Sequence, residues 1–372
     1  MPHAHLRHRR ILAGTAVVAL ATLTGCGATT SAPPADSGAS DDSGSPTVAF
    51  LLPENVNPRW ESQDAPFLEE ELQKLDPDAR LDTYNANNDA AAQQQQAEQA
   101  LTKGADVLVV IPVDADAAAV IATTAAQSDV PVVAYDRMIQ AEEVAAWIQA
   151  DMVKVGEDQA RWVVDHTEVG DNIVQIKGSP TDTNARLFDQ GYQNVLGPMY
   201  ASGERVLAYD TWTQGWDPAL ARTSVDQALT ALNNDVQAIL ASNDGNAASA
   251  IASLTEQGLD GQVPVTGLDG TVQALQLMLQ GKQGMTVWRP FDQMAARTAE
   301  VVDRLLNDED IADVATSQVT NDTGAQIPQV LTDYYVAADE EGVQYIIDND
   351  PSIEMDDVCT GATDSTPFCQ AS

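Results

Sequence analysis

The sequence predicts an α/β protein of two doubly wound lobes, each a parallel sheet covered by helices. Short apolar, β-branched runs alternate with helix-like stretches, which is typical of parallel sheets buried on both faces. The alternation restarts after about residue 150. The length of 372 residues also exceeds what one ordinary core fills.

The first half of the alternation contains four strands and three helices. The run at 106–111 is almost entirely Val, Leu and Ile, as a strand buried on both faces requires. The helix before it begins at Asp89, a good N-cap residue, and ends before Gly104, which suits a left-handed C′ position. The predicted strands are 47–52, 79–84, 106–111 and 130–135, and the predicted helices are 64–75, 89–103 and 115–128.

The second half repeats this pattern and then continues beyond it. A strand near 285–290, a long helix to Leu306 and a late strand at 330–336 follow the second set of strands. We therefore expect the chain to cross between the lobes more than once. The predicted strands of the second set are 172–177, 204–209, 236–241 and 264–266, and its helices are 153–166, 184–200, 218–232 and 245–257.

Residues 1–25 have the pattern of a secretion signal. A basic start precedes the apolar run 11–23, which is too short to span a bilayer as a permanent helix. The run closes with Leu23-Thr24-Gly25-Cys26, which resembles the lipobox of bacterial lipoproteins, where the cysteine is acylated. We expect Cys26 to anchor the chain to the outer face of the membrane through a flexible tether, 26–46. The alternative is an ordinary signal peptide with an unmodified cysteine.

Charge and histidine content exclude several function classes. The formal net charge of −38 disfavours nucleic acid and anionic membrane surfaces as partners. Of four histidines, only His166 lies outside the predicted signal peptide. The remaining chain thus lacks the residues for a histidine-based triad or a histidine metal cluster, and it has no phosphate-binding glycine motif. These features favour a binding protein that is not an enzyme and uses no metal or cofactor.

Two cysteines lie near the end of the chain, Cys359 and Cys369. In a secreted protein a disulfide between them is the default expectation. It would fix the tail, 349–372, and little else. A redox or metal role is the alternative, but two cysteines with no nearby histidine make a poor zinc site.

Polar clusters follow six apolar strands at the point where each strand ends. Ligands of open α/β sheets bind just beyond the carboxyl ends of the strands, so we expect the clusters to converge. The cluster 113–116 is the exception, because it has the pattern of a helix cap. The clusters are Asn57-Pro58-Arg59-Trp60, Val113-Asp114-Ala115-Asp116, Asp136-Arg137, Gly178-Ser179-Pro180-Thr181-Asp182, Ser242-Asn243-Asp244 and Gly267-Leu268-Asp269.

The clusters and their neighbours match a known family in order and spacing. The carrying motifs include Val133-Ala134-Tyr135-Asp136-Arg137, Gly178-Ser179-Pro180, Gly215-Trp216 and Met285-Thr286-Val287. From about residue 47 to 347 the chain resembles the type I periplasmic sugar-binding proteins of ABC transporters, the ribose, galactose and xylose group. The resemblance implies two lobes joined by three hinge strands that close on a monosaccharide. It also implies delivery to a membrane permease with a separate ATPase, and we expect a monomer.

The resemblance also implies lobe boundaries. We expect an N-terminal lobe of residues 47–150 plus 285–320 and a C-terminal lobe of residues 151–284 plus 321–348.

The polar clusters have the chemistry that a sugar ring requires. Apolar ring faces pack on tryptophan, and hydroxyls pair with the forked donors of arginine and with carboxylate and amide oxygens. The alternatives are core tryptophans, an internal Asp136–Arg137 ion pair and a helix cap at Asn243. By resemblance the ligand-binding residues are Arg59, Trp60, Asp136, Arg137, Asn184, Trp216, Asn243, Asp269 and Arg289.

The identity of the sugar follows from the same resemblance. The motifs follow the xylose-binding pattern, so D-xylose is expected. Arg289 stands where the pattern has lysine, and 55–58 lacks the charges of the pattern, which leaves glucose, galactose or arabinose as alternatives. A sensor presenting its closed form to a membrane receptor is a second function. A hydrolase using Asp136 and Asp269 is disfavoured, because neighbouring arginines would keep both carboxyls ionised.

Overall fold

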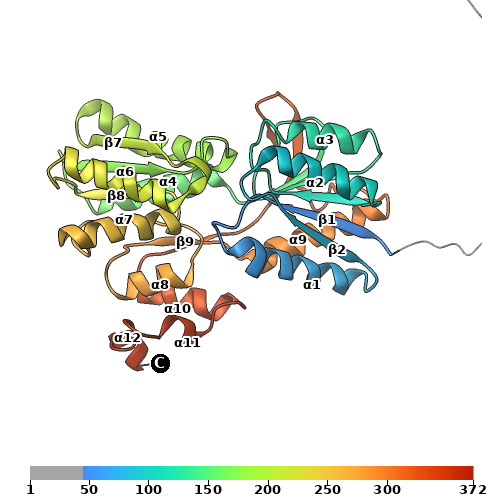
Figure 1. The fold of residues 1–372 in the computed structure, drawn as a ribbon. Helices are drawn as coiled ribbons and strands as arrows, with labels where there is room; N and C mark the ends of the chain where they lie inside the picture. Colours follow the sequence, from blue (N-terminus) through green and yellow to red (C-terminus); the bar gives the residue numbers. More distant parts are fainter. Residues whose placement is uncertain (1–44, 372) are drawn as a thin grey trace, which may run out of the picture. The chain divides into compact units, whose positions relative to one another are not determined.

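A seven-stranded sheet forms the core of the N-terminal lobe in the computed structural model, which describes residues 45–371 (Figure 1). The strand order is β10-β11-β5-β4-β3-β1-β2, and only β10 runs antiparallel to its neighbour. The strands are β1 (Thr47–Leu52), β2 (Arg80–Asn85), β3 (Val107–Val110), β4 (Val132–Tyr135), β5 (Val144–Gln149), β10 (Ser317–Thr320) and β11 (Gln326–Leu331).

Both faces of this sheet are buried because β3 and β4 are apolar at every position and β1 is apolar after Thr47. In β1, Phe50 faces helices α1 (Ala65–Leu75) and α9 (Phe291–Leu306), whereas Leu51 faces α2 (Ala90–Thr102) and α3 (Ala119–Ala126). The alternation of side chains along a strand produces these two layers. The polar group at 113–116 is a turn before α3, where Asp114 Oδ1 accepts from the backbone N–H groups of Asp116 and Ala117.

The C-terminal lobe repeats the plan with a smaller parallel sheet, ordered β7-β6-β8. Its strands are β6 (Asn172–Lys177), β7 (Val206–Trp212) and β8 (Ala238–Ala241). Helices α4 (Met152–Asp165) and α5 (Thr183–Ser202) cover one face, and α6 (Pro218–Ala231) and α7 (Asp244–Gln257) cover the other. The predicted strand 264–266 is reduced to one bridge between Val265 and Ile239.

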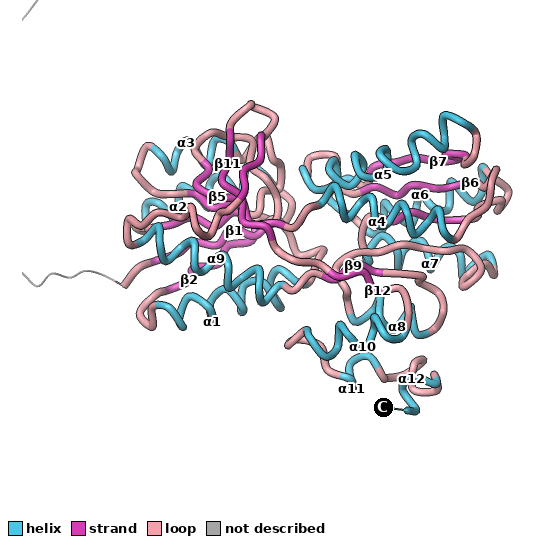
Figure 2. Tube along the Cα trace, turned by 180° about the vertical axis from the view of Figure 1, so that it is seen from behind, coloured by secondary structure: helices cyan, strands magenta, loops and turns pink. Residues whose placement is uncertain are grey.

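Three segments join the lobes, the number that the resemblance implies (Figure 2). The chain crosses between β5 and α4, between β9 (Thr286–Trp288) and α9, and between β11 and β12 (Tyr335–Ala337). Strands β9 and β12 pair antiparallel, so two of the crossings share backbone hydrogen bonds.

Several further expectations about the elements were wrong. The late strand expected at 330–336 is two strands, β11 and β12, which lie in different sheets. We did not expect β5, because its sequence Val144-Ala145-Ala146-Trp147-Ile148-Gln149 lacks the β-branched density of its neighbours. We also placed 321–348 entirely in the C-terminal lobe, whereas β11 pairs with β5 of the N-terminal sheet. The crossing therefore follows Leu331, because β5 presents a free strand edge that β11 extends.

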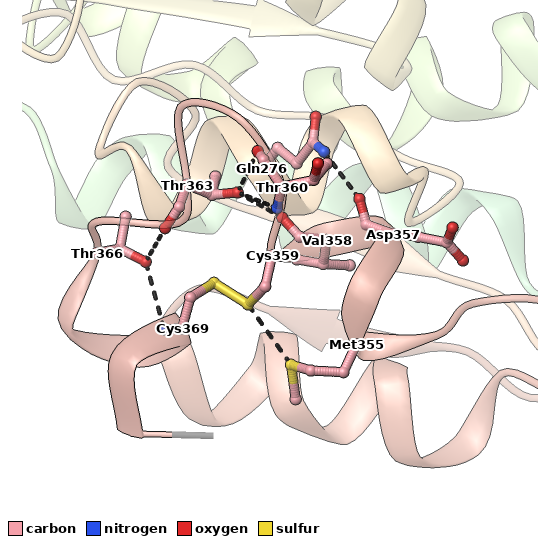
Figure 3. Close-up of a disulfide and its surroundings, with 9 residues drawn as sticks. All are labelled: Gln276, Met355, Asp357, Val358, Cys359, Thr360, Thr363, Thr366 and Cys369. Carbon is pink, nitrogen blue, oxygen red and sulfur yellow. Dashed lines mark hydrogen bonds between the residues drawn. A yellow bond between two sulfur atoms is a disulfide. The ribbon is translucent and has the colours of Figure 1, made fainter.

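The last part of the chain, from α10 onward, is folded against the C-terminal lobe. Helices α10 (Glu340–Asn349) and α11 (Met355–Val358) contact α8 (Val272–Leu279), and α12 (Pro367–Ala371) ends the described chain (Figure 1). The structure joins Cys359 to Cys369 in a disulfide (Figure 3). Within 45–371 no helix is both long enough and apolar enough to cross a bilayer, and Cys26 lies outside the described residues.

Candidate functional site

The polar strand ends converge on one cavity between the lobes. All nine residues proposed from the sequence as ligand-binding line it. Four further residues complete the lining, namely Asn57, Asp182, Phe188 and Leu268. The free volume is about 30 Å³, which is room for about two water molecules, because side chains of the two lobes contact one another inside it.

Asp136 is the centre of the site. It directly follows β4 with a left-handed φ of 63°, a conformation that aspartate tolerates better than most residues. Its Oδ2 accepts from Arg289 Nη1 at 2.8 Å and from Arg59 Nη1 at 3.2 Å, and its Oδ1 accepts from Asn184 Nδ2 at 2.8 Å. Burial would raise the pKa of Asp136, but the surrounding arginines outweigh it and lower the pKa below its ordinary value. The carboxylate is therefore ionised at neutral pH.

Asp269 is the matching carboxylate of the C-terminal lobe. Its φ of 107° is also left-handed, and its Oδ1 accepts from Arg289 Nη2 at 2.8 Å and lies 3.6 Å from Arg59 Nη1. Burial raises the pKa of Asp269, and Arg289 and Arg59 oppose that effect. The two guanidinium groups thus connect Asp136 of one lobe to Asp269 of the other.

A second ion pair lies beside the first. Arg137 Nε is 2.8 Å from Asp182 Oδ2, which also accepts from Trp216 Nε1 at 2.9 Å. The other oxygen of Asp182 accepts from the backbone N–H of Asn184 and caps α5. Asp136 and Arg137 therefore pair with different residues, and the expected alternative of a mutual ion pair is wrong.

The two tryptophans come from opposite lobes. Trp60 packs in the N-terminal core, with its Nε1 donating to Glu54 Oε1 at 2.6 Å and the Arg59 guanidinium 4.1 Å from its ring centre. Trp216 packs in the C-terminal core against Gly178, where a Cβ atom would lie 2.0 Å from the tryptophan Cη2. Each ring thus has an apolar contact in its own lobe and also lines the cavity.

Asn243 has the helix-capping role that we considered as an alternative. Its Oδ1 accepts from the backbone N–H of Asn246 at 3.0 Å and so caps α7. Its Nδ2 donates to Asn57 Oδ1 of the other lobe at 3.4 Å. A cap does not exclude a ligand contact, because Asn243 also lines the cavity.

Two polar atoms of the site have no hydrogen-bond partner, Asn184 Oδ1 and Arg289 Nε. Both residues are buried, and buried polar atoms without partners are costly. One atom is an acceptor and the other a donor, so a hydroxyl group satisfies either. Carboxylates outnumber guanidinium groups in the ion pairs around the cavity, which disfavours an anionic ligand. The acidic residues are Glu54, Asp64, Asp136, Asp182 and Asp269, and the basic ones are Arg59, Arg137 and Arg289.

Some lining residues were missed by sequence reasoning. Asn57, Asp182 and Leu268 stood in the polar clusters without an assigned role, and Phe188 stood in a helix. A signal existed for Asp182, because it directly precedes the helix beginning at Thr183 and so sits at a strand-to-helix turn. Within 45–371 no group of His, Cys, Asp and Glu side chains is arranged to hold a metal ion.

Comparison with known proteins gives one consistent family. A model of the periplasmic binding protein domain matches residues 48–310. The D-xylose-binding periplasmic protein of Escherichia coli is 38% identical over 232 residues, which cover 62% of this chain and 70% of that protein. The protein of the same description from Haemophilus influenzae is 35% identical over 272 residues, covering 73% and 80%.

A solved structure agrees in fold. The ABC transporter solute-binding protein of Clostridium phytofermentans, with bound β-D-glucose, superposes with a TM-score of 0.76 at 25% identity and covers 84% of this chain and 99% of that one. The expected type I fold is therefore confirmed.

Proposed function

Because the chain belongs to the periplasmic binding protein family, we propose that it is the substrate-binding lipoprotein of an ABC sugar importer and that its ligand is D-xylose. Like its relatives, the chain is a sugar-binding protein and not an enzyme. The observation that carries the proposal is the pair of carboxylates, Asp136 and Asp269, held between Arg59 and Arg289 beside tryptophans of both lobes.

The charged groups explain how a neutral sugar would be held. Hydroxyls would accept from the arginines and donate to the carboxylates, which are bonds of about 1.5–3 kcal/mol when one partner is charged. Trp60 and Trp216 would cover the C–H faces of the ring. A sugar is several times larger than the free volume of about 30 Å³, so the lobes must separate at the three crossings to admit it and then close again.

D-xylose is favoured over other aldoses by the two relatives that carry its name. The multiple sugar-binding periplasmic receptor of Rhizobium radiobacter is 29% identical over 319 residues. A description that names multiple sugars keeps other aldoses as alternatives to D-xylose. The relative's description as a receptor also keeps sensing as a second function for the same site.

Calorimetric titration against a panel of aldoses tests this function. We expect one site for D-xylose, and Trp60→Ala or Asp136→Ala should abolish the heat. Trp162→Ala is the matched control, because Trp162 stacks on His166 at the end of α4 and does not line the cavity. Tight binding of an amino acid or an oligosaccharide, with none of any aldose, would refute the proposal.

The lipid anchor needs a separate test. Cells fed a labelled fatty acid should incorporate it into this protein, and Cys26→Ser should remove both the label and the membrane association. Unlabelled wild-type protein in the medium would refute the anchor without affecting the sugar site.

A further inference from the structure

The C-terminal segment, residues 350–371, is fixed to the C-terminal lobe. Ile353 and Val358 are buried in one apolar cluster with Leu275 of α8 and Trp288 of β9. Hydrogen bonds and the disulfide hold the rest of the segment, as Figure 3 shows around the two cysteines. The segment therefore has a defined position from which its polar residues reach neighbouring elements.

Asp350 contacts the hinge strand β9 directly. Its Oδ2 accepts from Trp288 Nε1 at 2.8 Å, and both side chains are buried. Trp288 is the last residue of β9, and the next residue along the chain is Arg289. The bond thus fixes the strand end from which the Arg289 side chain extends into the cavity.

Ser352 reaches the other lobe. Its Oγ accepts from Gln63 Nε2 at 2.6 Å, and it donates to Asp350 Oδ1 at the same distance. Gln63 lies in a single π-helical turn, Trp60–Asp64, that begins directly after Arg59. Such turns are short departures from α-helical bonding that are often found at functional sites, and this one is tied to the C-terminal segment.

The two elements that the segment holds converge on one oxygen atom. Arg59 and Arg289 both donate to Asp136 Oδ2. We propose that Asp350 and Ser352 are positioning residues of the sugar site, which fix the π-helical turn and the end of β9 so that both arginines meet Asp136. The role extends the proposed sugar-binding function, on which its effect on affinity rests.

The hydrogen bond between Gln63 and Ser352 joins the two lobes, so it stabilises their closed arrangement. The Gln63–Ser352 bond joins residues 289 positions apart in the sequence and belongs to the arrangement in which the lobes touch. Loss of a bond of this kind should weaken sugar binding about threefold to tenfold, because sugar is held only when the lobes meet.

The experiment compares serine substitutions in the full-length protein. Ser352→Ala removes the hydroxyl, Ser352→Thr retains one, and Ser365→Ala is the matched control at an exposed position of the same segment. Hydrogen–deuterium exchange of peptides covering 57–66 and 285–291 is measured without sugar, and D-xylose affinity is measured by calorimetry.

We expect Ser352→Ala to raise exchange in 57–66 and to weaken the affinity about threefold to tenfold, while Ser352→Thr and Ser365→Ala behave as wild type. Asp350→Asn should raise exchange in 285–291. Unchanged exchange in both variants, or raised exchange with unchanged affinity, would overturn the proposal. If the wild type binds no aldose, the proposed function fails, and the exchange measurements alone decide whether the segment positions the two elements.

Discussion

Replacing Asp136 with asparagine removes a negative charge from between buried arginines and keeps the shape of the side chain. Asparagine also tolerates the left-handed φ of 63° at this position, whereas alanine would add a backbone cost of about 1–2 kcal/mol. Asp136→Asn therefore isolates the loss of charge from the loss of packing.

The loss of unfolding free energy in Asp136→Asn depends on the partners that Arg289 and Arg59 keep. Breaking a buried ion pair costs about 3–5 kcal/mol because the other charge stays buried. Arg289 keeps Asp269 at 2.8 Å, and Arg59 keeps Asp64 at 2.7 Å, so we expect the lower end, about 3 kcal/mol less unfolding free energy at pH 7. D-xylose affinity should fall about tenfold or more, since a charged acceptor contributes about 1.5–3 kcal/mol.

The shift in the pKa of Asp136 determines how its contribution to stability changes with pH. The folded-state pKa of Asp136 is lowered from 3.8 by the arginines against the effect of burial. Its contribution is therefore present above pH 3.8 and is lost as the pH falls through the lower folded-state value. The stability difference between wild type and Asp136→Asn should narrow in that acidic range.

Denaturant titrations followed by tryptophan emission measure the effect. Asp210→Asn is the matched control, because Asp210 pairs with Lys177 at 2.8 Å but its side chain is 38% exposed, and exposed pairs contribute about 1 kcal/mol or less. Lys177 also keeps Asp189 at 3.5 Å. If Asp136→Asn costs no more than Asp210→Asn, the inferred electrostatic role of Asp136 is wrong.

Three further perturbations give distinct outcomes. Burial raises the pKa of Asp244 to about 7, so the folded state binds more protons than the unfolded state, and the unfolding free energy falls as the pH rises from 3.8 to about 7. Asp244→Asn should reduce the difference in unfolding free energy between denaturation curves at pH 5 and pH 7. An unchanged difference would exclude Asp244 as its source. Gly178→Ala would place a Cβ atom 2.0 Å from the ring of Trp216, so overpacking should lower the unfolding free energy by about 1–3 kcal/mol. Displacement of the ring should also weaken binding in sugar titrations, and wild-type affinity would mean that the ring is not part of the site. Replacing Cys359 and Cys369 with serine should destabilise the C-terminal segment by about 2–3 kcal/mol through lost loop closure, seen as faster hydrogen exchange in 350–371 but not in β1, and uniform acceleration would contradict a local role.

Sequence patterns predicted the sheet cores and the residues at their polar ends. The apolar runs of β3 and β4 leave no alternative to burial on both faces, and the polar residues after such strands must then lie at one edge. The pattern failed for β5, where alanine and glutamine dilute the signal. It also failed for β11, because a short strand carries no information about which sheet edge it joins.

The pairing of charges was beyond sequence reasoning for a different reason. Arg289 and Asp136 are 153 residues apart, and the adjacent residues Asp136 and Arg137 face different partners because the left-handed turn at Asp136 separates their side chains. Contacts of this length depend on how two sheets and three crossings are placed, which no local pattern encodes.

The amino-acid sequence by itself determined the two-lobed α/β plan and the secretion signal pattern, since these follow from periodicity and composition. The family resemblance added nine of the thirteen residues that line the cavity. Only the tertiary structure decided which carboxylate each arginine holds and that Ser352 contacts Gln63. The physical reason is that periodicity fixes the face on which a side chain lies, whereas a hydrogen bond requires two distant segments to meet within about 3 Å.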